Sequence, residues 1–302
     1  MTTLTHPSHV DTGTVRGSRL RAEDVTLGYR DRVVVDEVST AVPDGKITVV
    51  VGANACGKST LLRGMARLLK PSSGQVVLDG SSIHAMGTRD VAQRLGLLPQ
   101  NPVCPEGVTV VDLVGRGRTP HHGRFQRWST ADEQAVIRAL EATDTLELAD
   151  RVVDELSGGQ RQRVWIAMAL AQETDLLLLD EPTTYLDVAH QVDVLDLLAE
   201  LNATRGTTVV MVLHELNLAA RYADHVVALL DGKVVAEGPP AQVITEESVL
   251  EVFGMRCRVV PDPVSHTPMV VPVGRHQPRP TEAPQPDRRR NQPRAIPNGG
   301  TP

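Results

Sequence analysis

The chain alternates between short aliphatic runs and longer segments in which apolar residues recur at helical spacing. The aliphatic runs have the length of strands, and their lack of polar alternation is expected of strands that are covered on both faces. They lie at residues 47–51, 75–78, 176–179, 208–213 and 226–230. Val, Ile or Leu fills most of their positions, so these runs are the predicted strands.

Two segments between these runs are predicted to form amphipathic helices. One covers residues 129–144. The other covers residues 188–203, where the predicted buried face consists of Val188, Val192, Leu195 and Ala199. Strands and helices that alternate in this way predict an α/β fold with a mostly parallel sheet.

Composition and charge exclude several classes of protein. The 302 residues are 41% hydrophobic and 23% charged, which is typical of a globular protein. The net charge of −6 disfavours general nucleic-acid binding, so no nucleic-acid partner is expected. No apolar run approaches about 18 residues, and the start of the chain lacks the apolar centre of a secretory signal. Neither a membrane span nor an export signal is therefore predicted.

The two ends differ in composition from the rest of the chain. Residues 1–18 are rich in Thr, Ser, His and Gly, and they are predicted to form a flexible arm. Residues 275–302 are rich in Pro and Arg and almost free of aliphatic side chains. Such a segment buries too little apolar surface to offset the entropy lost on ordering, so it is expected to be a disordered tail. The predicted folded domain is therefore residues 19–274.

A phosphate-binding loop is predicted directly after the run at 47–51. The sequence there has the pattern GxxxxGK[ST] between a strand and a helix. Its glycines allow the backbone to present several N–H groups to one anion, and the helix N-terminus adds positive potential. Lys58 is expected to reach the β- and γ-phosphates, and the Ser59 hydroxyl is expected to bind Mg²⁺. The predicted nucleotide-binding residues are Gly52, Ala53, Asn54, Ala55, Cys56, Gly57, Lys58, Ser59 and Thr60.

Ala55 is the unusual residue of this loop, because it stands where glycine is common in such loops of transporters. If the position requires a positive φ, alanine adds some strain there. Binding is expected to survive that strain.

Two carboxylates follow the aliphatic run at 176–179. Alternation along a strand directs the side chains of Asp180 and Glu181 to different sides. Asp180 can then support Mg²⁺, and Glu181 can face an attacking water as general base. Pro182 ends the strand. An ordinary polar strand end would look similar, but the preceding phosphate loop favours the catalytic interpretation.

A second glycine-rich helix start lies at Leu156-Ser-Gly-Gly-Gln160. Ser157 and Gln160 have the spacing of a capping box, which is a purely structural interpretation. That interpretation leaves Gly158 and Gly159 unexplained, because glycine is a poor helix former in the first turn. Glycines there suit a backbone that approaches an anion closely.

LSGGQ resembles the signature sequence of ABC ATPases. Together with GxxxxGKS, LLLLDEP and the downstream His214, it makes residues 20–272 resemble that family in the family's own order. The resemblance implies a P-loop NTPase fold of the ABC ATPase type, in which an antiparallel β subdomain and a helical subdomain, here about 101–172, accompany the mostly parallel core sheet.

The resemblance implies further roles for single residues. Tyr29 is similar to the aromatic residue that stacks on adenine, and Gln100 to the Q-loop glutamine that contacts Mg²⁺ and water. Residues 184–187, which end in Asp187, resemble the D-loop that crosses a dimer interface. His214 resembles the switch histidine that contacts the γ-phosphate. The implied ligands are ATP and Mg²⁺.

The resemblance also implies partners. In this family two copies pack head to tail, so Ser157, Gly158, Gly159 and Gln160 of one copy would close over ATP held by the other. The chain carries one ATPase core, so its channel is expected to be a pair of separate membrane permease subunits, with an extracytoplasmic substrate-binding protein as an indirect partner. The expected location is the cytoplasmic face of the membrane.

Segments 106–128 and 214–272 are similar to the ferric-siderophore importer branch. Iron–siderophore complexes are therefore the predicted cargo, and haem, vitamin B12 or another metal chelate remain alternatives. A soluble DNA-repair or regulatory ABC ATPase is an alternative of a different class. Repair proteins carry a long coiled-coil or zinc insertion between the phosphate loop and the signature, and this sequence has none. A regulator that does not hydrolyse ATP would be favoured by loss of Glu181 or His214, and both residues are present.

Overall fold

The computed structural model describes residues 18–123, 127–184 and 186–274. The predicted tail, and the predicted arm up to residue 17, lie outside these residues. Ser18, at the predicted boundary between arm and domain, is the first residue that the structure describes. Its side chain is buried, and its hydroxyl donates to the carbonyl of Leu20 at 2.7 Å, so Ser18 belongs to the folded domain.

A six-stranded sheet forms the centre of the described structure, with the strand order β10-β9-β3-β8-β7-β6. Its strands are β3 (Ile47–Gly52), β6 (Leu95–Leu98), β7 (Leu176–Asp180), β8 (Thr208–Val212), β9 (His225–Leu230) and β10 (Lys233–Gly238). Neighbours from β9 to β6 pair in parallel, and only β10 pairs antiparallel. Every residue of β3, β7 and β8 is buried, so the prediction of strands covered on both faces is confirmed for these three.

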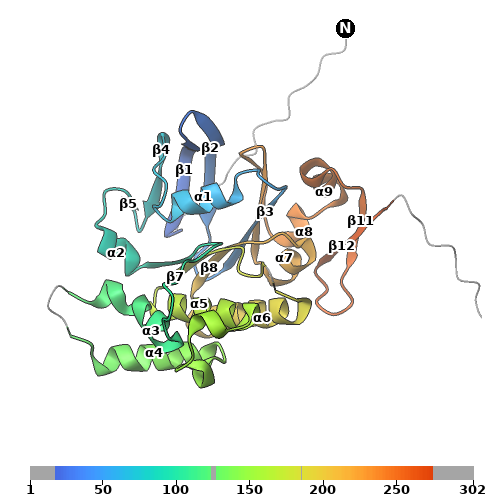
Figure 1. Ribbon diagram of the computed structural model, residues 1–302. Coiled ribbons are helices and arrows are strands. Elements are labelled where there is room, and N and C mark those ends of the chain that lie inside the picture. Colours follow the sequence, from blue (N-terminus) through green and yellow to red (C-terminus); the bar gives the residue numbers. More distant parts are fainter. Residues whose placement is uncertain (1–17, 124–126, 185, 275–302) are drawn as a thin grey trace, which may run out of the picture.

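A second, antiparallel sheet has the order β2-β1-β4-β5. It consists of β1 (Leu20–Tyr29), β2 (Arg32–Val42), β4 (Ser73–Leu78) and the short β5 (Ser81–Ser82). The predicted strand at 75–78 belongs to this sheet and not to the parallel one. Helix α1 (Lys58–Met65) lies between the two sheets, and its Leu61, Leu62 and Met65 are fully buried there (Figure 1).

The predicted helical subdomain is present below the central sheet (Figure 1). It contains α3 (Val110–Gly115), η1 (Arg116–His121), α4 (Thr130–Ala142), η2 (Leu146–Leu148), η3 (Val153–Glu155) and α5 (Gly158–Ala171). Helix α2 (Thr88–Ala92) precedes β6, and α6 (Val188–Arg205) follows β7. Apolar residues of α3, α4, α5 and α6 share one core with the lower face of the sheet.

The predicted buried face of α6 is wrong in part. Val188 is 77% exposed, whereas Val194, Leu195, Leu198 and Leu201 are buried. The first turn of α6 contributes no buried residue, so the apolar face that packs on the core begins only at Val194. A short apolar repeat cannot show where along a helix the contact with the core begins.

The C-terminal part of the domain packs beside β9 and β10. It comprises α7 (Leu216–Tyr222), α8 (Pro240–Val243), α9 (Glu246–Phe253) and the hairpin of β11 (Cys257–Pro261) and β12 (Pro268–Pro272). The Asn217 amide holds the hairpin, since its oxygen accepts from the N–H of Val270 at 2.7 Å and its nitrogen donates to the Val270 carbonyl at 3.3 Å. In the part of the chain that the structure describes, no helix combines the length and the apolar character needed to cross a bilayer.

A buried ion-pair cluster holds the helical subdomain together and generates a prediction. The Arg118 guanidinium, whose side chain is 7% exposed, lies 3.0 Å from Asp132 and 2.9 Å from Glu173 and also donates to the Ala171 carbonyl. Arg118→Met leaves the buried Asp132 carboxylate without this partner, so the free energy of unfolding should fall by about 3 kcal/mol. Chemical denaturation measures this change.

Arg138 provides the matched control, because it pairs with the same Glu173 but its side chain is 47% exposed. Arg138→Met should cost less than about 1 kcal/mol. Equal losses in the two variants would contradict the structural role given to Arg118.

Candidate nucleotide-binding site

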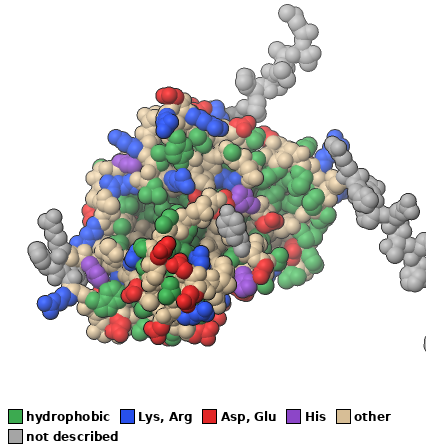
Figure 2. Space-filling view, in the orientation of Figure 1, with side chains coloured by type: hydrophobic (Ala, Val, Ile, Leu, Met, Phe, Trp, Pro, Cys, Tyr) green, Lys and Arg blue, Asp and Glu red, His purple; other side chains and the backbone are tan. Residues whose placement is uncertain are grey.

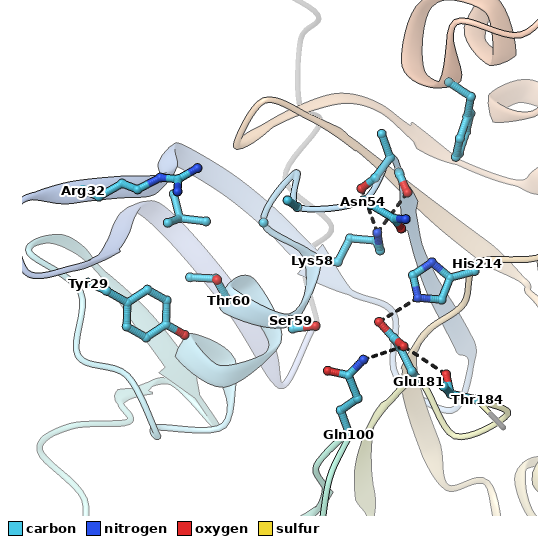
Figure 3. Close-up of a pocket in the computed structure, with 16 residues that line it drawn as sticks. Tyr29, Arg32, Asn54, Lys58, Ser59, Thr60, Gln100, Glu181, Thr184 and His214 are labelled. Carbon is cyan, nitrogen blue, oxygen red and sulfur yellow. Dashed lines mark hydrogen bonds and ion pairs between the residues drawn. The ribbon is translucent and has the colours of Figure 1, made fainter.

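A cavity of about 930 Å³ opens at the edge of the central sheet where β3, β6, β7 and β8 end (Figure 3). The phosphate loop after β3, Gln100 after β6, Glu181 after β7 and His214 after β8 all line it. Sixteen of the described residues line its wall: Tyr29, Arg32, Val34, Gly52, Ala53, Asn54, Ala55, Gly57, Lys58, Ser59, Thr60, Gln100, Glu181, Thr184, His214 and Phe253.

The loop between β3 and α1 has positive φ angles at Gly52, where glycine suits them, and at Ala55, where alanine does not. Gly52 has φ of 153°, and a Cβ placed on it would lie 2.4 Å from the carbonyl oxygen of Leu229 on the neighbouring β9. Glycine is therefore required there by close approach of the backbone. Ala55 has φ of 63°, so the condition stated for strain at this position is met. A non-glycine residue in this region costs about 1–2 kcal/mol.

Lys58 lies at the base of the cavity with its side chain folded into the loop. It is buried, and its Nζ donates to the carbonyl oxygens of Gly52 and Ala53, each at 2.9 Å. The ammonium group is thereby held at the centre of the loop (Figure 3). A positive charge fixed in this loop is suited to a phosphate group.

Asp180, the last residue of β7, faces the start of α1. The hydroxyl of Ser59 donates to its Oδ1 at 2.7 Å. Burial raises the pKa of the Asp180 carboxyl above its usual value, and the hydrogen bond from Ser59 offsets only part of this rise. Asp180 is only 2% exposed and lies behind Ser59 without lining the cavity itself. A hydroxyl and a carboxylate oxygen so close together form the kind of hard donor set that Mg²⁺ prefers.

Asp180 and Glu181 have different partners, and strand alternation is not the cause, because Glu181 lies beyond the end of β7. The strand ends at Asp180, and Glu181 takes the left-handed backbone conformation with φ of 56°. Such a conformation is unfavourable for a glutamate and marks a position that its surroundings fix. It turns the carboxylate toward Gln100 and His214 (Figure 3).

Three side chains hold the Glu181 carboxylate in the cavity. Its Oε1 lies 2.7 Å from Nε2 of His214, and its Oε2 accepts from the Gln100 amide at 2.7 Å and from the Thr184 hydroxyl at 2.9 Å. Burial alone would raise the pKa of Glu181, but these hydrogen bonds, that of His214 first, lower it below its usual value. The carboxylate is therefore ionised and able to accept a proton at neutral pH.

Tyr29 closes the opposite end of the cavity, at the end of β1. Its side chain is 45% exposed, and its hydroxyl accepts from Nη1 of Arg63 on α1 at 3.2 Å. An exposed aromatic ring held at one end presents a face on which a flat base can stack.

Four lining residues carry no site role in the sequence analysis. Arg32 and Val34 follow Tyr29 on β2, Phe253 ends α9, and Thr184 is identified only as the start of the D-loop. The spacing of Arg32 and Val34 from Tyr29 is a local signal that could have indicated them. Phe253 comes from a distant segment of the chain, and no local pattern marks it.

The signature residues do not reach this cavity. Ser157 is the N-cap of α5 and forms the predicted capping box with Gln160, and neither Gly158 nor Gly159 lines the cavity wall. Asp187 caps α6 and also stays outside. Cys56 is buried within the loop and does not line the cavity either. One chain therefore brings together the predicted loop, carboxylates, glutamine and histidine, but not the signature or the end of the D-loop.

Comparison with known proteins identifies the family. The family described as ABC transporter matches residues 35–184. The chain is 55% identical to the probable siderophore transport system ATP-binding protein YusV of Bacillus subtilis (strain 168), over 85% of this chain and 94% of that protein. It is 52% identical to the ferric enterobactin transport ATP-binding protein FepC of Escherichia coli (strain K12), over 86% of this chain and 96% of that protein.

A solved structure shares the fold. The dimeric structure of MJ0796, a bacterial ABC transporter cassette, superposes with a TM-score of 0.65 at 27% identity and covers 73% of this chain and 98% of that one. YusV and FepC share about half of their residues with this chain along nearly their whole length, which is enough for a common fold. The chain therefore belongs to the ABC transporter family and is one of its ATP-binding ATPases.

Proposed function

We propose that this chain energises the import of iron–siderophore complexes by binding and hydrolysing Mg²⁺–ATP between two head-to-tail copies. The observation that carries the proposal is the position of the Glu181 carboxylate, which projects into the cavity from the strand end beside the phosphate loop. A carboxylate at this place, held by His214, Gln100 and Thr184, is suited to activate a water for attack on a terminal phosphate.

Residues in and beside the cavity have further parts in this proposal. The loop amides and Lys58 hold the phosphates, and Tyr29 stacks on the adenine. His214 contacts the γ-phosphate and steadies Glu181. Ser59, Asp180 and the Gln100 amide oxygen, which points away from Glu181 in Figure 3, would hold Mg²⁺. Bound Mg²⁺ would neutralise charge on the phosphates.

The head-to-tail dimer follows from what one chain leaves incomplete. The cavity is open, and the helix N-terminus formed by Ser157, Gly158, Gly159 and Gln160 lies elsewhere on the same chain. A helix N-terminus attracts anions, so a second copy can complete the site by placing its α5 over the γ-phosphate. ATP then binds the closed dimer more tightly than the open one, and hydrolysis releases the closed state.

The cargo and the membrane partners are proposed from the relatives. YusV and FepC are named for siderophore and ferric enterobactin transport, and this chain aligns with them over most of its length. We therefore assign it to an importer with two separate permease subunits and an extracytoplasmic binding protein, at the cytoplasmic face of the membrane. Haem, vitamin B12 and other chelates are the alternative cargoes.

Lys58→Ala tests the phosphate-binding loop. A hydrogen bond between the Lys58 ammonium and a phosphate contributes about 1.5–3 kcal/mol to binding. Its loss should weaken ATP affinity about 10- to 100-fold. Titration with a fluorescent ATP analogue measures it. Lys46→Ala is the control, because the Lys46 side chain is 55% exposed and pairs with Asp224 outside the cavity. Unchanged affinity in Lys58→Ala would contradict the proposed loop.

Glu181→Gln tests the general base. Glutamine cannot take a proton from water, so hydrolysis should slow about 100- to 10,000-fold. ATP should still bind, and the undissociated dimer should accumulate in analytical ultracentrifugation. Glu200→Gln, at an exposed position of α6, should leave both properties unchanged. Hydrolysis at the unaltered rate in Glu181→Gln would rule out this base.

Uptake measurements test the cargo. Cells that lack this chain should lose uptake of radiolabelled ferric siderophore and regain it when the wild-type chain, but not Glu181→Gln, is supplied. Uptake of haem and vitamin B12 should be unaffected. Loss of haem or vitamin B12 uptake with intact siderophore uptake would contradict the cargo and leave the ATPase assignment standing.

A further inference from the structure

The two glycines of the signature have different surroundings within their own chain. A Cβ placed on Gly158 would meet nothing within 4 Å. A Cβ placed on Gly159 would lie 3.2 Å from Cδ2, 3.4 Å from Cγ and 3.5 Å from Nε2 of His190. The open side of Gly158 leaves room for a ligand or a partner, whereas the side of Gly159 is already covered by an imidazole ring from α6.

His190 is held in this place by the D-loop aspartate. Asp187 Oδ1 accepts the backbone N–H of His190 at 3.0 Å and lies 2.7 Å from its ring Nδ1. One carboxylate oxygen thus caps α6 and orients the imidazole, so that the opposite edge of the ring, with Cδ2 and Nε2, faces Gly159. Both side chains are partly exposed, 43% for His190 and 68% for Asp187, so the contact lies at the surface of the chain.

Two backbone carbonyls between Glu181 and Asp187, those of Pro182 and Leu186, accept hydrogen bonds from the neighbouring helices. Gln162 of α5 donates to the Pro182 carbonyl at 2.7 Å, and Gln191 of α6 donates to the Leu186 carbonyl at 3.2 Å. Thr184 binds the Glu181 carboxylate itself. Displacement of this segment therefore affects the catalytic carboxylate, the start of α6 and the signature helix together.

We propose that His190 is a positioning residue that sets the signature turn at Gly159 and links it to Asp187 of the same chain. This inference rests on the proposed function, in which α5 of one copy closes over ATP held by the other. Gly159 is then glycine because His190 occupies the space of a side chain, and the ring transmits the position of the D-loop to the helix end that grips the partner's nucleotide.

A double-mutant cycle tests the contact. In the Glu181→Gln background, ATP-dependent dimerisation is measured by analytical ultracentrifugation for Gly159→Ala, His190→Ala and the double variant. His190→Ala removes the ring atoms that a methyl group at Gly159 would meet, so Gly159→Ala should weaken the dimer about tenfold less in that background. Gly158→Ala is the matched control, and its effect should not depend on residue 190.

His190→Asn separates the two interactions of the ring. Asparagine keeps an N–H group near the Nδ1 position but lacks the atoms that face Gly159. It should therefore weaken dimerisation nearly as much as His190→Ala, while ATP affinity of the monomer and the thermal unfolding midpoint stay at the wild-type values. A lower unfolding midpoint in His190→Asn, together with dimerisation at the level of the Glu181→Gln parent, would contradict a positioning role.

The results also separate this inference from the function on which it rests. If Glu181→Gln alone does not dimerise with ATP, the proposed dimer mechanism fails. If it dimerises, but the effects of Gly159→Ala and His190→Ala are additive, only the inference about His190 is overturned.

Discussion

Parallel pairing of β3, β8, β7 and β6 is the constraint on which the site depends. These strands are neighbours in the central sheet and run in one direction, so their carboxyl ends meet at the same edge. The phosphate loop, His214, Glu181 and Gln100 each follow one of these strands. Residues that are far apart in the sequence are thereby brought within hydrogen-bonding distance of a single carboxylate. No long-range charge attraction is needed to assemble them, because the sheet places their backbones.

The same architecture explains why one chain does not complete the site. Helix α5 packs beneath the sheet, and its N-terminus lies outside the cavity. The D-loop segment after Glu181 leads to Asp187 and then to His190, whose ring occupies the space that a side chain at Gly159 would need. In the proposed dimer, the residues that position the carboxylate and the residues that grip the partner's nucleotide are therefore connected within one polypeptide. Such a connection allows closure and catalysis to respond together.

Local pattern was sufficient for part of this structure. The buried strands and the phosphate loop could be predicted, because aliphatic runs and glycine spacing report directly on local geometry. The buried face of α6 could not, since Val188 has helical spacing but lies before the point at which the helix meets the core. The positive φ of Glu181 accompanies three tertiary partners that no local pattern indicates, and Phe253 lines the cavity from a C-terminal helix far away in the sequence. Arg32 faces the cavity because β2 turns back directly after Tyr29.

The central claim is that each nucleotide is enclosed by the loop of one copy and the signature of the other. Mixing two defective variants, Lys58→Ala and Ser157→Arg, each also carrying Glu181→Gln, tests it most directly. Neither variant should self-associate with ATP. Lys58→Ala lacks the charge that holds the phosphates, and Ser157→Arg blocks the N-terminus of α5 that would contact the partner's nucleotide. Their mixture contains one intact composite site, so ATP-dependent heterodimers should form in analytical ultracentrifugation. A mixture that stays monomeric while the parent Glu181→Gln protein dimerises, or a Ser157→Arg variant that dimerises unaided, would contradict the account.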